Sequence, residues 1–556
     1  MNTATVRDIG STLSTDPRVE RAFPRLAESQ ILALEPFGRR VRIAKGEAVW
    51  TAGRVDMCMY VVVEGEMEIV EGRGGAHIVT HGPGTFSGDI DILSGRAAIV
   101  SAVAKTDLEL LEVPADCVRS IVGERPDIGQ IILQAFLLRR ALLLESQSTG
   151  PVVIGSRYCR DTLRIREFLA RNHSPFVWED LEANPSVSAI LSDLNLDEED
   201  VPVVVLQSGE VLRAPTNADL AGALGMVRPL EDKIYDLVIV GAGPSGLAAA
   251  VYGASEGLST LLLDSLGPGG QAGASSKIEN YMGFPLGITG QELADGALLQ
   301  AEKFGARIVV PGKVTHIGCH EIGGHEVEIE GVGKVECRCV ILASGAQYRK
   351  LAVEGMERFE GQGIYYAATH VERVLCGESK VAVVGGGNSA GQAAIYMAEN
   401  ASEVLLILRS GDLRKDMSAY LARRIEGADN IRLLLNSEIT AMDGAQMLER
   451  ITITNRETGE ERTDRVSGVF VMIGAVPQTD WLPDTVARDA KGFILTGRQV
   501  TPEVGWKPSR PPFYLETSCP GVFAVGDARS GSIKRVASGV GEGSMAVAFV
   551  HQFLAS

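Results

Sequence analysis

The sequence predicts an α/β protein of several domains, with a β-roll at the N-terminus and two Rossmann-like domains in the C-terminal half. Three patterns predict this fold class. Residues 41–114 alternate apolar and polar side chains in short runs separated by glycine turns, and residues 151–205 follow a strand–helix–strand–helix–strand order. Buried β-branched runs at 236–240 and 381–384 each end in a glycine-rich turn followed by a small-residue helix, which is typical of dinucleotide-binding units.

Length and composition narrow the class of protein. The 556 residues are too many for one hydrophobic core and suggest roughly three to four domains. The formal net charge of −18 argues against a nucleic-acid partner, whose phosphates require a basic face. Residues 1–18 are polar and no apolar window is long enough to span a bilayer, so we expect neither a secretion signal nor membrane association. The eight cysteines never form Cys-x-x-Cys, which predicts reduced thiols and a cytoplasmic location; we expect no metal site.

The N-terminal β region contains the cassette Phe-Ser-Gly-Asp-Ile-Asp-Ile-Leu-Ser-Gly-Arg-Ala-Ala-Ile-Val at 86–100, and helical periodicity follows at 117–144. This segment resembles the phosphate-binding cassette of cyclic-nucleotide-binding domains. The resemblance implies a cyclic AMP or cyclic GMP effector, and a guanidinium is a good partner for its phosphate. Asp91 stands where the family has a small neutral residue and Asp89 where it has Glu, so a cassette kept only for interaction is the alternative. The implied effector contacts are Gly88, Asp89, Ile90, Arg96 and Ala97.

The middle segment resembles the thioredoxin/glutaredoxin fold. Pro202, which lies in the apolar run 201–205, matches that family's cis-proline. The turn that carries the family's redox cysteines precedes the helix predicted at 163–172, and here it keeps one cysteine, Cys159. A thiolate at a helix start beside arginines can have a lowered pKa. Cys159 is therefore a candidate monothiol site, and a cysteine of no redox consequence is the alternative.

The turn at 241–246 has the form Gly-x-Gly-x-x-Gly. Gly241 makes the tight turn, Gly243 lets the backbone approach a pyrophosphate, and Gly246 allows close packing of helix and strand. Pro244 and Ser245 open the helix, whose free N–H groups favour phosphate. Asp264 ends the next strand, 259–263, and is placed to accept a ribose hydroxyl.

From residue 235 onward the chain resembles thioredoxin reductase and its low-molecular-weight flavoprotein relatives. The matching motifs are Gly-Gly-Gln at 269–271, Ile-Glu-Asn-Tyr at 278–281, Ala-Ser-Gly-Ala at 343–346, and Gly-Val-Phe-Ala-Val-Gly-Asp at 521–527, with Lys-Arg-Val following at 534–536. The resemblance implies bound FAD, held in addition to the first turn by Gly270, Gln271, Asn280, Ala343, Gly345, Gly526, Asp527, Arg535 and Val536.

A second dinucleotide unit lies between these segments. Its turn is formed by Gly385, Gly387, Asn388, Ser389 and Ala390, and Arg409 ends the following strand where an NAD-binding unit would have an acid. A cation there pairs with a 2′-phosphate, so this unit is predicted to bind NADPH. A domain that has lost its nicotinamide is the alternative.

The segment 363–370 lacks the Cys-x-x-Cys that thioredoxin reductases carry at this place. Ala367 and His370 occupy the cysteine positions, so the usual dithiol relay is absent. His370 is a candidate proton donor during two-electron transfer. The sequence thus predicts an NADPH-dependent FAD oxidoreductase whose small-molecule or protein electron acceptor is unidentified, possibly regulated by a cyclic nucleotide. A non-catalytic flavin-binding redox sensor is the alternative.

The predicted organisation has five segments, and the resemblance implies a homodimer. The segments are a cyclic-nucleotide-binding-like domain (1–148), a thioredoxin/glutaredoxin-like domain (149–228), an FAD-binding domain in two parts (229–350 and 478–556) and an inserted NADPH-binding domain (351–477).

Overall fold

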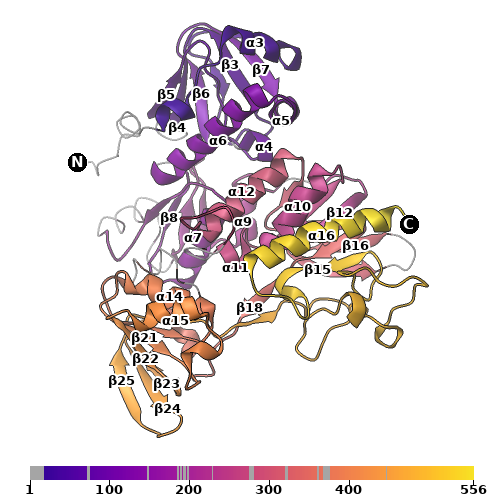
Figure 1. Cartoon of the computed structure of the whole chain (residues 1–556). Coiled ribbons are helices and arrows are strands. Elements are labelled where there is room, and N and C mark those ends of the chain that lie inside the picture. Colours follow the sequence, from indigo (N-terminus) through magenta and orange to yellow (C-terminus); the bar gives the residue numbers. More distant parts are fainter. Residues whose placement is uncertain are drawn as a thin grey trace.

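The computed structural model of the chain has three lobes that meet around a small middle domain (Figure 1). It describes residues 18–71, 75–89, 91–146, 150–184, 187, 191, 196, 200–227, 230–273, 278, 281–319, 324–359, 362–366, 368, 373, 376–445 and 447–556. In these parts of the chain, no helix is long and apolar enough to cross a membrane.

The N-terminal lobe is a β-roll followed by helices. One sheet has the order β1-β7-β3 and the other β2-β6-β4-β5. Its helical part is not continuous, as the periodicity suggested, but breaks at Arg125, because Pro126 opens a new helix. The elements of this lobe are α2 (Val19–Ala22), α3 (Glu28–Leu34), β1 (Arg39–Ile43), β2 (Ala48–Trp50), β3 (Cys58–Glu64), β4 (Met67–Glu71), β5 (His77–His81), α4 (Asp91–Ser94), β6 (Val100–Ala104), β7 (Leu108–Pro114), α5 (Ala115–Glu124) and α6 (Pro126–Ser146).

The middle domain is a four-stranded sheet of order β11-β10-β8-β9. Strands β8 and β9 are parallel, whereas β10 runs antiparallel to both β8 and β11. The helix predicted at 163–172 begins at Arg160, because Cys159 is already its N-cap. The second helix expected from the strand–helix–strand–helix–strand order of 151–205 falls, at 187–194, mostly outside the described residues. The elements are β8 (Val152–Ile154), α7 (Arg160–Arg171), β9 (Val177–Glu179), β10 (Val203–Val205), β11 (Val211–Arg213) and α9 (Asn217–Ala223).

The third lobe is built on a sheet of order β14-β13-β12-β17-β16-β15, with β28 joining β17. The strands β14, β13, β12, β17 and β28 pair in parallel. Strands β13 and β28 are buried throughout and β12 is nearly so, as expected for a sheet covered on both faces, whereas β14 is partly buried and β17 is continuously buried only from Cys339 onward. Helices α10 and α16 pack against each other over the sheet (Figure 1). The elements are β12 (Tyr235–Val240), α10 (Pro244–Ser255), β13 (Thr260–Leu263), α11 (Gly270–Gly273), α12 (Gly290–Lys303), β14 (Arg307–Val309), β15 (Val314–Cys319), β16 (His325–Ile329), β17 (Gly333–Leu342), β28 (Val522–Ala524) and α16 (Val536–Leu554).

The inserted lobe repeats the pattern with a parallel sheet of order β19-β26-β20-β21-β22 and a three-stranded meander, β23-β24-β25. Two antiparallel strands, β18 (Ala346–Tyr348) and β27 (Ala475–Pro477), connect it to the third lobe, one leading in and one leading back. Its elements are β19 (Ile364–Tyr365), β20 (Val381–Val384), α14 (Asn388–Ala398), β21 (Val404–Ile407), α15 (Ala419–Glu426), β22 (Ile431–Leu434), β23 (Ser437–Asp443), β24 (Arg450–Asn455), β25 (Glu461–Arg465) and β26 (Gly468–Val471).

Candidate functional site

A cleft of about 460 Å³ opens at the carboxyl ends of β12 and β17, where open α/β sheets bind their ligands. Residues of the inserted lobe, among them Gln392 and Met472, line it together with residues of the third lobe. Thirteen of the predicted cofactor contacts line this cleft: Gly241, Gly243, Pro244, Ser245, Asp264, Gly270, Gln271, Ala343, Gly345, Ser389, Asp527, Arg535 and Val536.

The turn after β12 has room for glycine only. Gly241 has φ +108°, and a Cβ there would lie 2.3 Å from the carbonyl oxygen of Ala343. A Cβ at Gly246 would lie 1.8 Å from the Gly241 carbonyl oxygen. At Gly243, by contrast, a Cβ would meet only the Cα of Gly270 at 3.9 Å, so backbone is exposed to the cleft at the N-terminus of α10. This cradle fits a pyrophosphate, because the helix start offers N–H groups and positive potential.

The carboxylate of Asp264 holds the glycine turn after β12 in place through hydrogen bonds to the backbone. It accepts hydrogen bonds from the backbone N–H groups of Ala242 (2.7 Å), Leu266 (2.9 Å) and Gly267 (2.9 Å). An ionised carboxylate has about four acceptor positions, so a position is left for the ribose hydroxyl that the sequence predicted. Asp264 therefore shapes the cradle and also lines the cleft.

The second FAD motif packs beside this turn: a Cβ at Gly526 would lie 2.4 Å from the Ser245 Oγ, and Asp527 lines the cleft. Burial raises the pKa of Asp527 and lowers that of Lys534, whose ammonium donates to the Asp527 carbonyl oxygen at 2.8 Å. Gly526 does not line the cleft; its N–H donates to Glu542 at 2.7 Å, and Glu542 forms a buried ion pair with Arg529. These contacts hold the segment that presents Asp527.

Several residues that sequence reasoning did not select also line the cleft. Tyr348 and Tyr366 stack with ring centroids 6.0 Å apart and come from the two lobes. Arg171 comes from the middle domain and donates to the Gly270 carbonyl oxygen at 3.2 Å. Gln271, which was predicted, donates to the Ala346 carbonyl oxygen. The tyrosine at 366 follows a recognisable lead-in, but nothing local to Arg171 signals its position.

In the inserted lobe, the glycine turn repeats the geometry of the first one. A Cβ at Gly385 would lie 2.3 Å from the Met472 carbonyl oxygen and 3.1 Å from the Cβ of the buried Ala390. Gly387 is the N-cap of α14 and has open space beside it, whereas the Asn388 side chain accepts from Ser418 N–H at 2.8 Å.

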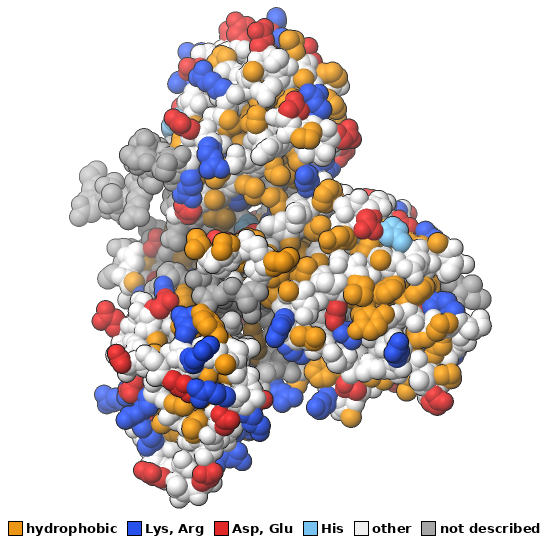
Figure 2. Space-filling model, viewed as in Figure 1, with side chains coloured by type: hydrophobic (Ala, Val, Ile, Leu, Met, Phe, Trp, Pro, Cys, Tyr) orange, Lys and Arg blue, Asp and Glu red, His pale blue; other side chains and the backbone are white. Residues whose placement is uncertain are grey.

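The strand β21 leads to an exposed basic region that includes the predicted Arg409. Arg409, Arg414 and Lys415 are exposed, and Arg414 pairs with Glu426 at 2.6 Å. Figure 2 shows Lys and Arg side chains on this lobe. This surface has the charge that a 2′-phosphate requires.

Three predicted residues, Ile90, Asn280 and His370, lie outside the described part of the chain. Cys159, the other catalytic candidate, is partly buried at the N-cap of α7. Its neighbour Tyr158 accepts a hydrogen bond from Gln362 Nε2 at 2.5 Å through its carbonyl oxygen. The turn that carries Cys159 thus lies against the inserted lobe, immediately before the segment 363–366.

The cassette of the N-terminal domain has an unexpected charge arrangement. Asp89 and Asp91 both pair with the buried Arg140, and Asp89 is 2.8 Å from it. Burial raises the pKa of Asp89 to about 6. The neighbouring pocket is lined mainly by apolar side chains together with Gly88, Asp89, Asp91 and Arg139. Neither Arg96 nor Ala97 lines it.

Arg96 points instead into the interface with the middle domain, where its guanidinium donates to the Asn172 carbonyl oxygen. Asn172 Nδ2 in turn donates to the Leu266 carbonyl oxygen at 2.9 Å, beside Asp264. Ala97 lies near Gly225 of the middle domain, where a Cβ would be 3.0 Å away. One chain of contacts therefore connects the cassette with the cradle of the cleft.

These features define a class of protein: two dinucleotide-binding domains face one cleft, as in flavin-dependent oxidoreductases that use a nicotinamide. Residues 235–543 match the family of pyridine nucleotide-disulphide oxidoreductases, and residues 40–125 match the cyclic nucleotide-binding domain.

Individual relatives are consistent with this family match. The thioredoxin reductase of Bacillus subtilis (strain 168) is 32% identical over 327 residues, which cover 58% of this chain and 96% of that protein. The bifunctional thioredoxin reductase/thioredoxin of Mycobacterium leprae (strain TN) is 31% identical over 58% of this chain and 67% of that protein. Solved thioredoxin reductases from Lactococcus lactis and T. acidophilum each cover 58% of this chain with a TM-score of 0.52, at 28% and 31% identity and over 99% and 100% of their own chains.

The chain belongs to the pyridine nucleotide-disulphide oxidoreductase family, and it carries a cyclic nucleotide-binding domain at its N-terminal end. The α/β multidomain fold is confirmed for these parts, and the cofactors are FAD and NADPH, as the sequence predicted.

Replacing Gly246 by Ala should remove FAD from the purified protein, because the new Cβ collides with the Gly241 carbonyl oxygen and opens the cradle. Overpacking of this kind costs about 1–3 kcal/mol of stability. The flavin-to-protein absorbance ratio measures the effect. Gly296→Ala is the matched control, since Gly296 lies in helix α12 with nothing within 4 Å of its Cβ position. Full FAD content in Gly246→Ala would contradict this account of the turn.

Glu302 of α12 is buried against the N-terminal domain, near Arg96, Arg140 and Asp91, and burial raises its pKa to about 7. The folded state therefore holds a proton that the unfolded state releases near pH 4.3, so this contribution to stability is lost as pH rises from about 4 to about 7. Glu302→Gln should flatten that fall in melting temperature, whereas Glu336→Gln, at an exposed position, should not. Equal slopes in wild type and Glu302→Gln would show that Glu302 is charged across this range.

Proposed function

We propose that this protein is an NADPH-dependent FAD oxidoreductase that passes electrons to an acceptor without the dithiol of thioredoxin reductases. The observation that carries the proposal is the shared cleft, in which Ser389 and Met472 of the inserted lobe line the same space as Gly243 and Asp527. FAD and NADPH can thus bind in one cleft, between the third lobe and the inserted lobe.

The residues divide the work of binding and orienting. The N-terminus of α10 and Gly243 receive the FAD pyrophosphate, Asp264 the ribose, and Asp527 the ribityl chain. Arg409 selects NADPH through its 2′-phosphate. FAD, when bound, supplies two-electron redox chemistry, and the protein positions it and limits access of water.

Because this dithiol is missing, we propose that the middle domain is the electron acceptor when Cys159 forms a mixed disulfide with an external small-molecule thiol: two electrons from the flavin and two protons break that S–S bond and release two thiols. No cysteine lies in the segment 363–370, and Cys159 is the single cysteine between residues 149 and 228. We propose a thioredoxin/glutaredoxin-like fold for this domain, supported by its strand order and the place of Cys159 at the N-cap of α7.

The contact between Tyr158 and Gln362 supports this acceptor route, because it places the Cys159 turn against the lobe that faces the cleft. A covalently attached acceptor also has a high effective concentration. A diffusible quinone, oxygen or another carrier is the rival acceptor, and Cys159→Ser distinguishes the two routes in a disulfide-reduction assay.

Regulation by the N-terminal domain is part of the proposal. A cyclic phosphate at the cassette would compete with the Asn172 carbonyl oxygen for Arg96, and Asn172 in turn contacts Leu266 at the FAD cradle. Occupancy of the cassette would thereby alter the loop that follows Asp264. This connection equally favours the second candidate, a flavin-binding sensor whose state a partner reads, so catalysis has to be tested directly.

Anaerobic addition of NADPH to the FAD-loaded full chain should bleach the long-wavelength flavin absorption band within seconds of mixing. Arg409→Ala should weaken the response to NADPH roughly tenfold while leaving that to NADH nearly unchanged, since a charge-assisted hydrogen bond contributes about 1.5–3 kcal/mol. Arg465→Ala, at an exposed site on β25, is the control. An unchanged spectrum of the wild type with excess NADPH would favour the sensor.

Cyclic AMP or cyclic GMP should raise the melting temperature of the full chain, because a ligand at 100 times its Kd adds about 2.7 kcal/mol to folding stability. Arg96→Ala should abolish this gain, whereas Arg42→Ala, an exposed residue on β1, should retain it. An unchanged melting temperature with each nucleotide at millimolar concentration would show that the cassette does not bind cyclic nucleotides.

A further inference from the structure

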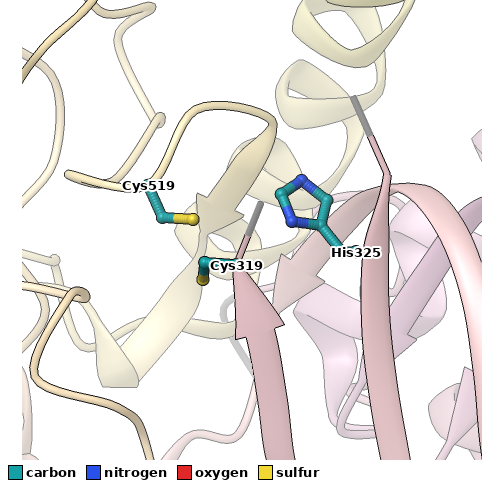
Figure 3. Close-up of side chains that lie close together, drawn as sticks. All are labelled: Cys319, His325 and Cys519. Carbon is teal, nitrogen blue, oxygen red and sulfur yellow. The ribbon is translucent and has the colours of Figure 1, made fainter. Parts of the chain in front are cut away.

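A cluster of two cysteines and one histidine lies at the edge of the FAD-binding sheet, away from the cleft. Cys319 ends β15, His325 begins β16, and Cys519 precedes β28 (Figure 3). One ligand-type atom from each, a sulfur or a ring nitrogen, lies within 4.8 Å of the others.

The sheet register places these groups together. Cys319 and His325 are direct partners across the antiparallel pair β15–β16, so their side chains stand on the same face. Cys519 approaches that face from the chain segment that returns to the sheet as β28. His325 is 3% exposed and Cys519 4%, whereas Cys319 is partly exposed.

An unpaired ring nitrogen of His325 independently points to a ligand at this cluster. Nδ1 of His325 is buried and has no hydrogen-bond partner, although the ring lies beside two thiols (Figure 3). Leaving a buried polar atom unpaired costs about 1–3 kcal/mol, so such atoms usually face a ligand, water or ion. The other ring nitrogen, Nε2, faces Gly521, where a Cβ would lie 3.0 Å from it.

We infer that Cys319, His325 and Cys519 bind a zinc ion. Two sulfurs and one imidazole nitrogen are a donor set that Zn²⁺ prefers, with water as the fourth ligand on the side where Cys319 is partly exposed. On binding, the two thiols lose their protons to solvent and the imidazole stays neutral, so the Zn²⁺ charge is balanced by two thiolates. Zn–S and Zn–N bonds of about 2.3 and 2.0 Å place donor atoms about 3.5–3.8 Å apart, so the donor atoms, which lie within 4.8 Å of one another, need to approach by about 1.3 Å at most.

The position of the ion gives it a structural consequence. Cys519 is separated by only a few residues from β28, which leads through Gly526 to Asp527, a residue that lines the FAD cleft. A zinc ion would fasten that segment to the β15–β16 edge of the same sheet. We expect zinc therefore to slow FAD loss without touching the cleft itself.

The test uses the FAD-loaded full chain, reduced, incubated with ZnCl₂ and freed of excess metal by gel filtration. Mass spectrometry of the metal content should give about one zinc per chain, and Cys319→Ser, Cys519→Ser and His325→Gln should each lower it at least about tenfold. Cys337→Ser is the matched control, because Cys337 is a buried cysteine paired with His325 one strand further along and outside the cluster.

A measurement on the wild type keeps the inference independent of the folding of variants. Zinc should protect the partly exposed Cys319 thiol of the native chain from a thiol-specific reagent, and a chelator should make it reactive again. Unchanged thiol reactivity with zinc would overturn the assignment, as would equal zinc content in the three cluster variants. A native mass lower by about 2 Da, with Cys319 and Cys519 joined in one peptide, would show a disulfide in place of a metal site.

Discussion

The close approach of backbone segments around the first glycine turn is the constraint on which the site depends. Gly246 packs against the Gly241 carbonyl oxygen, and Asp264 holds the turn through three backbone N–H groups. Ser245 is the meeting point with the second FAD motif, because a Cβ at Gly526, Gly539 or Gly543 would lie within 2.5 Å of it. Two segments almost three hundred residues apart in sequence thereby form one cradle, and we propose that the FAD pyrophosphate binds where they meet.

The N-terminal and middle domains are connected to this cradle through polar contacts. Arg140 is buried with Asp89 and Asp91, and it donates to the His173 carbonyl oxygen at the end of α7. His173 itself contacts Asp295 of α12 at 2.7 Å. Buried charged groups lower the folding stability unless all their partners are in place. We therefore expect a change at Asp89 or Asp91 to destabilise the interface between the two domains. This arrangement gives a physical route from the cassette to the flavin site.

Local motifs could be predicted from the sequence, and contacts between distant segments could not. The turn at Gly241 and the acid at Asp264 are readable because the glycine spacing and the strand end define them. The direction of the Arg96 side chain could not be predicted, because it depends on the carbonyl oxygen of Asn172 in another domain. The position of Arg171 at the cleft and the approach of Cys519 to Cys319 could not be predicted for the same reason: each contact is made only in the tertiary fold, and no spacing in the chain indicates it.

The central claim is that one cleft holds FAD between the glycine cradle and the inserted lobe. A crystal structure of the full chain purified with FAD tests it most directly. The account predicts density for the pyrophosphate against Gly243 and the start of α10, with the rest of the cofactor reaching toward Asp527 and the wall that carries Ser389. FAD bound elsewhere on the chain, or a cleft that stays empty at saturating FAD, would contradict it.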